Sequence, residues 1–199
     1  MSRDVYSRFT ELEKAESGDS FSIKCEYRNS VYAVMAPHGG KIESGTTEIS
    51  VAIALNDLSL YLFEGKKANN NRMLHITSSN FDEPQCMELL DKVETVLSIH
   101  GARDPDLGIR ERVWVGGSLH EEFRRNLEEK LKTLEILVEF NPNFSGKNTD
   151  NICNRGISKE GMQLEITKSL RDKLIQDKIL LKQFSNSVRM AMMLTYPID

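Results

Sequence analysis

The chain has 199 residues, of which 39% are hydrophobic and 28% charged, and this composition predicts one globular domain over residues 1–199. Its net charge of −4 argues against a surface built broadly for nucleic acid. Its apolar runs are shorter than the ~20 residues that a membrane-spanning helix needs. We therefore expect neither nucleic acid nor a membrane among its partners.

The N-terminal sequence MSRDVYSRFTELEKAE is charged throughout and lacks the apolar segment of a signal peptide. It predicts a protein that is made in the cytoplasm and reaches the exterior only through lysis or a similar route. Three dispersed cysteines form no C-x-x-C pair, which disfavours a disulfide framework or a zinc knuckle. Neither the acidic net charge nor the charged segment 120–134 signals a dimer, so we expect a monomer.

Helical and strand periods alternate along the chain. FSIKCEY at 21–27 alternates like a half-buried strand, whereas VYAVMA at 31–36 is continuously apolar like a strand buried on both faces. In chain order we expect helix 5–14, strands 21–27 and 31–36, helix 44–55, strands 58–63 and 73–77, helix 83–90, strands 93–99 and 112–117, helix 120–134, strands 135–140 and 162–167, and a helical C-terminal part. This alternation predicts an α/β domain with a mixed, largely parallel central sheet flanked by helices.

Two of the predicted strands run directly into a histidine. VYAVMA is followed by Pro37 and His38, and VETVLSI at 93–99 is followed by His100. In an open α/β sheet, ligands bind beyond the carboxyl ends of the strands. We therefore expect both histidines at one edge of the sheet. His75, within MLHIT, is instead expected at an ordinary core or surface position of a strand.

The segment APHGGKIESG at 36–45 places Glu43 five residues after His38. The glycine pair between them allows the backbone to fold back, because glycine adopts conformations that other residues resist. With His100, these side chains make a candidate zinc set of two histidines and one carboxylate, and catalytic zinc sites use three protein ligands. Glu165, inside the otherwise apolar strand 162–167, is the candidate general base. Spacing alone leaves open a loop histidine, a helix-dipole glutamate and a simple glycine turn.

Several motifs occur together, and in combination they are specific. They are H-G-G-x-I-E at 38–43, S-I-H-G at 98–101, and N-I-C-N-R-G followed by G-M-Q-L-E between 151 and 165. In this combination and order, the chain resembles the poly-γ-glutamate hydrolase family of phages and bacilli. The resemblance covers most of the chain, from about Val31 to the C-terminal helix.

The resemblance implies a zinc-carboxypeptidase-like α/β fold and hydrolysis of γ-linked glutamate polymers, which in a phage setting degrades a host capsule. It also implies Zn²⁺ on His38, Glu43 and His100, with Glu165 as the general base. Each unit of such an anionic polymer carries a free α-carboxylate, so the site should offer cations. Arg155 is the predicted substrate-binding residue, because a guanidinium pairs bidentately with a carboxylate.

Two other functions remain open on the sequence. One is a zinc amidase or carboxypeptidase that acts on cell-wall peptides, and the other is a non-catalytic, metal-stabilised binding module. Arg103 and Lys147 read more readily as solvated surface charges than as substrate ligands. Asn151 and Asn154 either orient the substrate or hold the loop between 141 and 156, and the sequence does not decide between these roles.

Overall fold

The structure is a computed structural model that describes residues 4–198. The helices are α1 (Phe9–Ala15), α2 (Thr46–Ala54), α3 (Pro84–Leu90), α4 (His120–Leu131), α5 (Lys168–Gln176) and α6 (Lys178–Thr195). The strands are β1 (Phe21–Glu26), β2 (Tyr32–Gly40), β3 (Ser59–Gly65), β4 (Thr95–Ala102), β5 (Arg112–Gly116), β6 (Leu137–Phe140) and β7 (Gly161–Thr167). Short 3-10 turns are η1 (Asn71–Leu74), η2 (Lys132–Leu134), η3 (Pro142–Phe144) and η4 (Ile152–Asn154). Among these residues, no helix is both long and apolar enough to cross a membrane.

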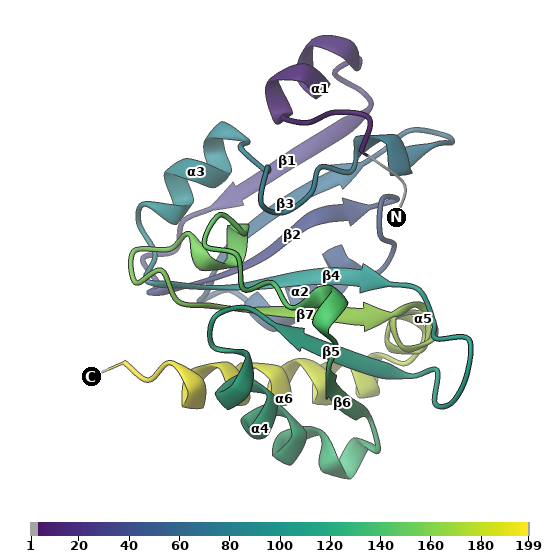
Figure 1. Cartoon of the computed structure of the whole chain (residues 1–199), viewed down its shortest axis with the longest axis vertical. Coiled ribbons are helices and arrows are strands. Elements are labelled where there is room, and N and C mark those ends of the chain that lie inside the picture. Colours follow the sequence, from purple (N-terminus) through teal and green to yellow (C-terminus); the bar gives the residue numbers. More distant parts are fainter. Residues whose placement is uncertain (1–3, 199) are drawn as a thin grey trace.

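Within the described range, seven strands form one mixed sheet in the order β1-β3-β2-β4-β7-β5-β6 (Figure 1). The inner strands β3, β2, β4 and β7 run parallel to one another, and β6 is parallel to β5. β1 and β5 run antiparallel to β3 and β7. The predicted α/β class and largely parallel mixed sheet are confirmed. The predicted strand at 73–77 is wrong, because residues 71–74 form η1 and residues 75–77 join no strand.

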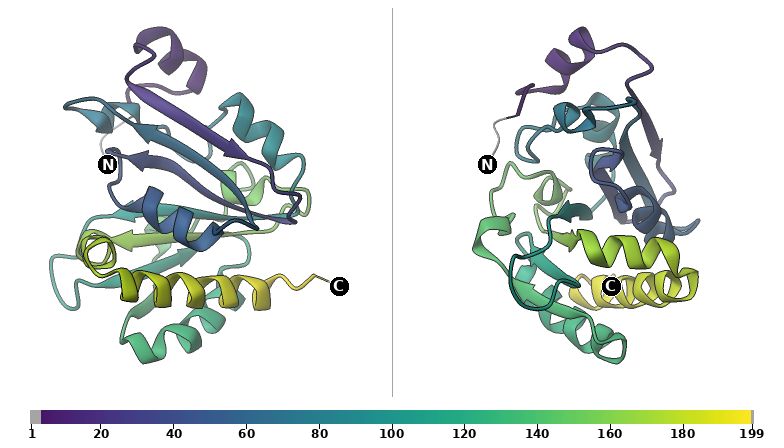
Figure 2. Two further views of the ribbon diagram at one scale, coloured as in Figure 1. Left: turned by 180° about the vertical axis from the view of Figure 1, so that it is seen from behind. Right: turned by 90° about the vertical axis from the view of Figure 1, so that its right-hand side faces the viewer.

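Apolar cores lie on both faces of the sheet. On one face, α2, α4, α5 and α6 pack against side chains such as Val34, Leu97 and Leu164. The view from behind in Figure 2 shows α2, α5 and α6 lying across this face. On the other face, α1, α3 and η4 cover Met35 and Phe63 on the neighbouring strands β2 and β3. Farther along β4 and β7, this face carries the buried polar side chains of Ser98, His100, Gln163 and Glu165.

The alternation of side chains along β4 separates apolar from polar positions. Leu97 and Ile99 point into the helix-covered core, so Ser98 and His100 point to the opposite face. The register of β4 with β7 pairs His100 with Glu165, which brings both side chains to the same face. β2 lies between β3 and β4. The chain passes from β2 to its neighbour β3 on one side, and the next strand, β4, then pairs with β2 on the other side. This is a topological switch point, where open α/β sheets bind their ligands.

Candidate metal centre

His38 lies in β2, at an irregular point of the strand. The register with β3 shifts between Ala36 and Gly39, which is the signature of a bulge and explains how Pro37 fits into an inner strand. The Nε2 atom of His38 lies 2.8 Å from the carbonyl oxygen of Ile76. Because a carbonyl oxygen only accepts, Nε2 carries the proton and Nδ1 presents its lone pair to the site.

The glycine pair brings Glu43 back to His38. Gly40 has a φ of +60°, and a Cβ on Gly39 would lie 2.5 Å from Thr47 Oγ1, so neither position accepts a larger residue without strain. The backbone N–H of Glu43 then donates to the carbonyl oxygen of His38 at 2.9 Å. The resulting turn folds the chain back as the spacing predicts.

The predicted ligand atoms converge at the switch point. His38 Nδ1 lies 3.1 Å from His100 Nδ1 and 3.4 Å from Glu43 Oε2, and His100 Nδ1 lies 3.8 Å from the same Oε2. Zinc binds such atoms at about 2.0–2.2 Å in a tetrahedron, which places them roughly 3.3–3.6 Å apart. All three side chains are buried. The donor set therefore fits a zinc ion in both chemistry and spacing.

Neighbouring groups orient these side chains. His100 Nε2 lies 2.8 Å from Ser98 Oγ, and with that N–H donated to the hydroxyl the Nδ1 lone pair faces the site. The backbone N–H of Gly101 donates to Glu43 Oε2 at 2.8 Å. Burial lowers the pKa of His100 to about 3, which keeps the imidazole neutral. Burial opposes ionisation of Glu43, but His38, His100 and the Gly101 N–H outweigh it and lower its pKa to about 2. Both groups are thus in the protonation state that a metal ligand needs.

His75 belongs to the site as well, which its sequence context does not predict. Its ring stacks on that of His38 at 4.0 Å between centroids, and its Nδ1 lies 2.7 Å from Asp4 Oδ1. His38, Glu43 and His75 have ligand atoms within 4.8 Å of one another, so they form a second candidate group. The His75 Nε2 atom is 3.9 Å from Glu43 Oε1. The set with His100 is more compact, with its ligand atoms 3.1–3.8 Å apart, so both groups are candidate ligand sets and the one with His100 fits a single ion more closely.

Glu165 is buried beside this centre. Its Oε1 accepts a hydrogen bond from Gln163 Nε2 at 3.1 Å, and Gln163 Oε1 in turn accepts one from Asn151 Nδ2 at 3.1 Å. Burial, together with the negative charge of Glu43, raises the pKa of Glu165 well above its usual range. A carboxyl group with a raised pKa holds a proton firmly once it has accepted one, and a cation bound beside it would favour the ionised form that a general base needs.

Two arginines act on the carboxylates of the centre. Arg171, on α5, is buried and donates to the backbone carbonyl oxygens of Ile166, Ala102 and Ser44. Arg72, in η1, is 61% exposed and places Nη1 3.5 Å from Glu43 Oε1. The positive charges of both lower the pKa of Glu165, against the larger effect of burial. Sequence reasoning named neither residue.

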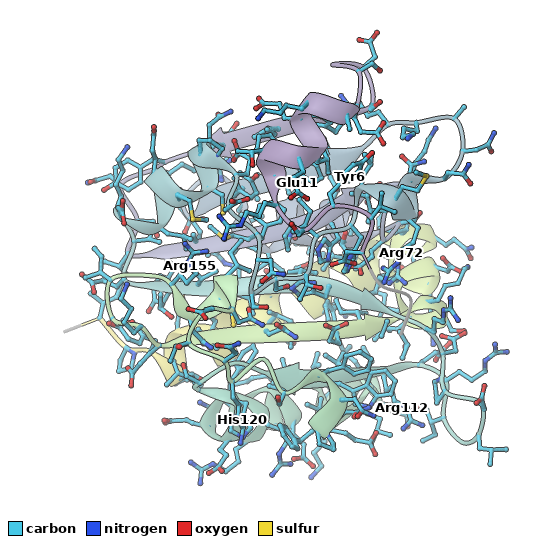
Figure 3. All side chains as sticks on the ribbon, turned by 45° about the horizontal axis from the view of Figure 1, so that its top comes forward. Tyr6, Glu11, Arg72, Arg112, His120 and Arg155 are labelled. Atoms are coloured by element: carbon cyan, nitrogen blue, oxygen red, sulfur yellow. The ribbon has the colours of Figure 1, made fainter. Side chains whose placement is uncertain are left out.

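The predicted substrate-binding residue Arg155 lies elsewhere. Its Nη1 donates to the carbonyl oxygen of Phe81 at 3.0 Å, and Figure 3 shows Arg155 and Arg72 at opposite ends of the sheet. The structure therefore brings together His38, Glu43, His100 and Glu165 but not Arg155. Its role in substrate binding stays a prediction, without support from this position.

The two loop asparagines have distinct positions. Asn154 donates to the carbonyl oxygens of Gly146 and Asn148 and accepts from the Ser118 N–H, so it holds the loop. Asn151 caps η4 and also reaches Gln163, and through it Glu165. Of the alternatives that the sequence leaves open, loop holding thus describes Asn154, while Asn151 also supports the site.

The fold and site together define an α/β protein with a candidate metal centre at the switch point of a mixed sheet. A family model for poly-γ-glutamate hydrolase matches residues 6–195, and the chain belongs to this family. This confirms the resemblance seen in the motifs. YmaC of Bacillus subtilis (strain 168) is 35% identical over 178 residues, which are 87% of this chain and 73% of YmaC. The SPβ prophage-derived YoqZ of the same strain is 36% identical, covering 86% of this chain and 61% of YoqZ.

Solved structures agree with this assignment. A bacteriophage poly-γ-glutamate hydrolase is 32% identical and superposes with a TM-score of 0.88, covering 99% of this chain and all of that one, 100%. The apo, zinc-free form of YndL is 29% identical, with a TM-score of 0.85 over 98% of this chain and 100% of that one. The CwlD amidase from Clostridioides difficile, 11% identical with a TM-score of 0.52 over 84% of this chain and 99% of that one, shares the fold alone.

Proposed function

We propose that this chain hydrolyses the γ-glutamyl amide bonds of poly-γ-glutamate with a zinc ion held by His38, Glu43 and His100. The observation that carries the proposal is the spacing of the three ligand atoms, 3.1, 3.4 and 3.8 Å apart, beside the buried Glu165. Family membership supplies the substrate class.

Two observations support zinc in particular. The donor set is two imidazole nitrogens and one carboxylate oxygen, a combination that zinc binds at catalytic sites. The related YndL has a structure described as its zinc-free form, which implies that YndL also has a zinc-bound form. A bound zinc ion supplies a Lewis acid that polarises the scissile carbonyl and lowers the pKa of the attacking water.

The protein groups around the site have separate tasks in this proposal. Glu165 takes the proton of the attacking water and later delivers it to the leaving amine; a zinc ion bound beside it would offset the burial that raises its pKa and favour the ionised form. Gln163 holds one carboxylate oxygen, so the other is free to face the water. The Gly101 N–H holds Glu43 Oε2, and the buried Arg171 guanidinium adds a positive charge near Glu43 and Glu165.

The biological setting that we propose is degradation of a capsule by a phage-derived protein. Its support is the likeness to a bacteriophage hydrolase and to a prophage-derived relative. We propose that the chain is made in the cytoplasm and meets the polymer after lysis. Purified protein added to encapsulated bacilli should then strip the capsule within the time in which it shortens the free polymer. Capsules that stay intact while the free polymer is cut would contradict this setting.

The test of the chemistry is the chain length of purified poly-γ-glutamate after incubation with the protein, measured by size-exclusion chromatography. We expect shortening that a chelator abolishes and added zinc restores. The variant Glu165→Gln should bind zinc with the stoichiometry of the wild type, by metal analysis, but lose most of its turnover. Shortening that survives complete metal removal, or full activity in the Glu165→Gln variant, would overturn the proposal.

A further inference from the structure

Arg72 is an exposed cation beside a buried site. Its side chain is 61% exposed, and among residues 4–198 its guanidinium has one polar partner, Glu43, with Nη1 3.5 Å from Oε1. A guanidinium carries five N–H donors, so most of those on Arg72 face solvent next to the candidate metal centre. The remaining polar groups of the centre are largely buried carboxylates and imidazoles.

The second arginine at the site does not have this freedom. Arg171 is 6% exposed, and its guanidinium already donates to three backbone carbonyl oxygens, those of Ile166 in β7, Ala102 in β4 and Ser44 in the connection from β2 to α2. The N–H donors of Arg171 are therefore used in contacts within the protein. Arg155, the cation that the sequence favours, lies at the other end of the sheet from Arg72 (Figure 3). Of these three arginines, Arg72 combines proximity to the centre with free donors.

The substrate requires such a cation. Each unit of poly-γ-glutamate carries its own α-carboxylate, which loses part of its hydration when the polymer meets the site. A carboxylate that loses water on binding needs a charged or hydrogen-bonding partner in return. Along the polymer, the α-carboxylate nearest to the scissile bond belongs to the unit that provides the scissile nitrogen, because it sits on the carbon bonded to that nitrogen.

We infer that Arg72 binds the α-carboxylate of the glutamate unit on the leaving-amine side of the scissile bond. This inference rests on the proposed function, whose substrate it specifies. The contact to Glu43 is long, at 3.5 Å, and Arg72 itself is exposed, so exchanging that contact for one with a substrate carboxylate costs little, and the fork of the guanidinium matches a carboxylate bidentately. Arg72 thereby favours γ-linked units with a free α-carboxylate over the same units with that group amidated.

The experiment compares two substrates and three proteins. The substrates are a short γ-glutamate oligomer and the same oligomer with its α-carboxylates converted to carboxamides. The proteins are the wild type, Arg72→Gln and the matched control Arg124→Gln. Arg124 lies on α4 and, like Arg72, pairs with a single glutamate oxygen, that of Glu128 at 3.0 Å. Zinc content, melting temperature, kcat and KM are measured for each.

For the carboxylate oligomer, Arg72→Gln should lower kcat/KM by about 10- to 100-fold, mainly through KM, as expected for loss of a charged hydrogen-bonded pair. For the carboxamide oligomer, the variant should match the wild type within about threefold. Arg72→Lys should recover part of the loss. Arg124→Gln should behave like the wild type on both substrates, and zinc content should be equal in all proteins.

Equal losses on both oligomers, or a loss of zinc in Arg72→Gln, would overturn the inference, because Arg72 would then act by holding Glu43 in place. Failure of the proposed function is recognised separately, as a wild type that cleaves neither oligomer. In that case calorimetric binding of the uncleaved carboxylate oligomer decides the role of Arg72: a matching loss of affinity in Arg72→Gln supports it, and unchanged affinity rejects it.

Discussion

Two histidines, His100 and His75, are candidates for the third zinc ligand. Replacing each of them by glutamine tests which one binds the ion. His100 Nδ1 lies 3.1 Å from His38 Nδ1 and 3.8 Å from Glu43 Oε2, whereas the ligand atoms of the group with His75 lie within 4.8 Å of one another, a looser set. We predict that His100→Gln removes a zinc ligand and that His75→Gln removes only a stacked neighbour.

The magnitudes follow from the binding free energy of zinc. A protein site with four ligands binds zinc with about 10–16 kcal/mol, so one ligand contributes roughly 3 kcal/mol, or about 100-fold in Kd. Loss of a group that supports the ligands weakens zinc binding by at most about 10- to 100-fold. His75 donates no hydrogen bond to a ligand in this structure, so His75→Gln should raise the Kd for zinc by less than about tenfold.

The assay is the zinc-induced rise in melting temperature, each variant being compared with itself in chelator so that effects on the fold cancel. At a zinc concentration of about 100 times the wild-type Kd, zinc raises the free energy of unfolding of the wild type by roughly 2.7 kcal/mol. For a chain of this size, that raises the melting temperature by about 5–11 °C. His75→Gln should keep at least about 1.4 kcal/mol of this, and His100→Gln about 0.4 kcal/mol. A zinc response lost in His75→Gln and retained in His100→Gln would refute the reasoning and make His38, Glu43 and His75 the ligand set.

Three further predictions concern the groups around the ligands. Because the pKa of Glu165 is raised, the metal-free native state holds a proton that the unfolded chain releases above pH ~4.3, so stability should fall by up to about 1.4 kcal/mol per pH unit until the folded pKa is reached. Urea unfolding in chelator should show this slope, and Glu165→Gln should lack it; a slope shared by both proteins contradicts the assignment. Gly101→Ala should cost about 1–3 kcal/mol in thermal unfolding and weaken zinc binding, since its Cβ would lie 2.7 Å from Arg171 Cζ and 2.9 Å from Glu43 Cβ, and a neutral effect would count against this crowding. Gln163→Leu should lower kcat with little change in KM in steady-state kinetics, because it removes the donor that orients Glu165, whereas a change confined to KM would indicate substrate contact.

Much of the centre could be predicted from the sequence because its parts lie at strand ends. Continuous apolar runs identify inner strands, and the carboxyl ends of parallel strands meet at one edge, which is enough to bring His38 and His100 together. The strand boundaries were less predictable. Pro37 lacks an N–H donor and argues for a strand that ends at residue 36, yet a bulge lets β2 continue to Gly40.

His75 escaped prediction for a physical reason. In MLHIT, Leu74 and Ile76 are buried while Met73 and His75 are more exposed, so burial alternates as it would in a strand. An extended segment that packs one side against a core produces the same alternation without any strand partner. The local pattern therefore shows which side chains turn inward but not what the outward histidine meets, which is set by the distant His38.

Arg155 illustrates the opposite error, in which closeness along the chain was taken for closeness in space. It precedes β7, whereas Glu165 lies near the carboxyl end of that strand. Residues that lead into a strand lie at its amino end, so several residues of extended chain, each advancing about 3.3 Å, separate the two positions. Arg72 reaches the same centre from the β3–α3 connection, which follows the carboxyl end of β3. The parallel sheet thus explains why the distant cation, and not the near one, lies at the site.

The fold alone does not set the substrate. The CwlD amidase shares this fold at 11% identity, so a mixed sheet of this kind does not by itself choose a polymer. The choice depends on side chains that contact the substrate and leave the fold unchanged. An exposed arginine beside buried carboxylates favours a substrate whose units carry free carboxylates, and amidating that carboxylate removes the partner of the guanidinium without altering the scissile amide. Comparing cleavage of the carboxylate and carboxamide oligomers therefore tests whether Arg72 sets the substrate specificity of this site.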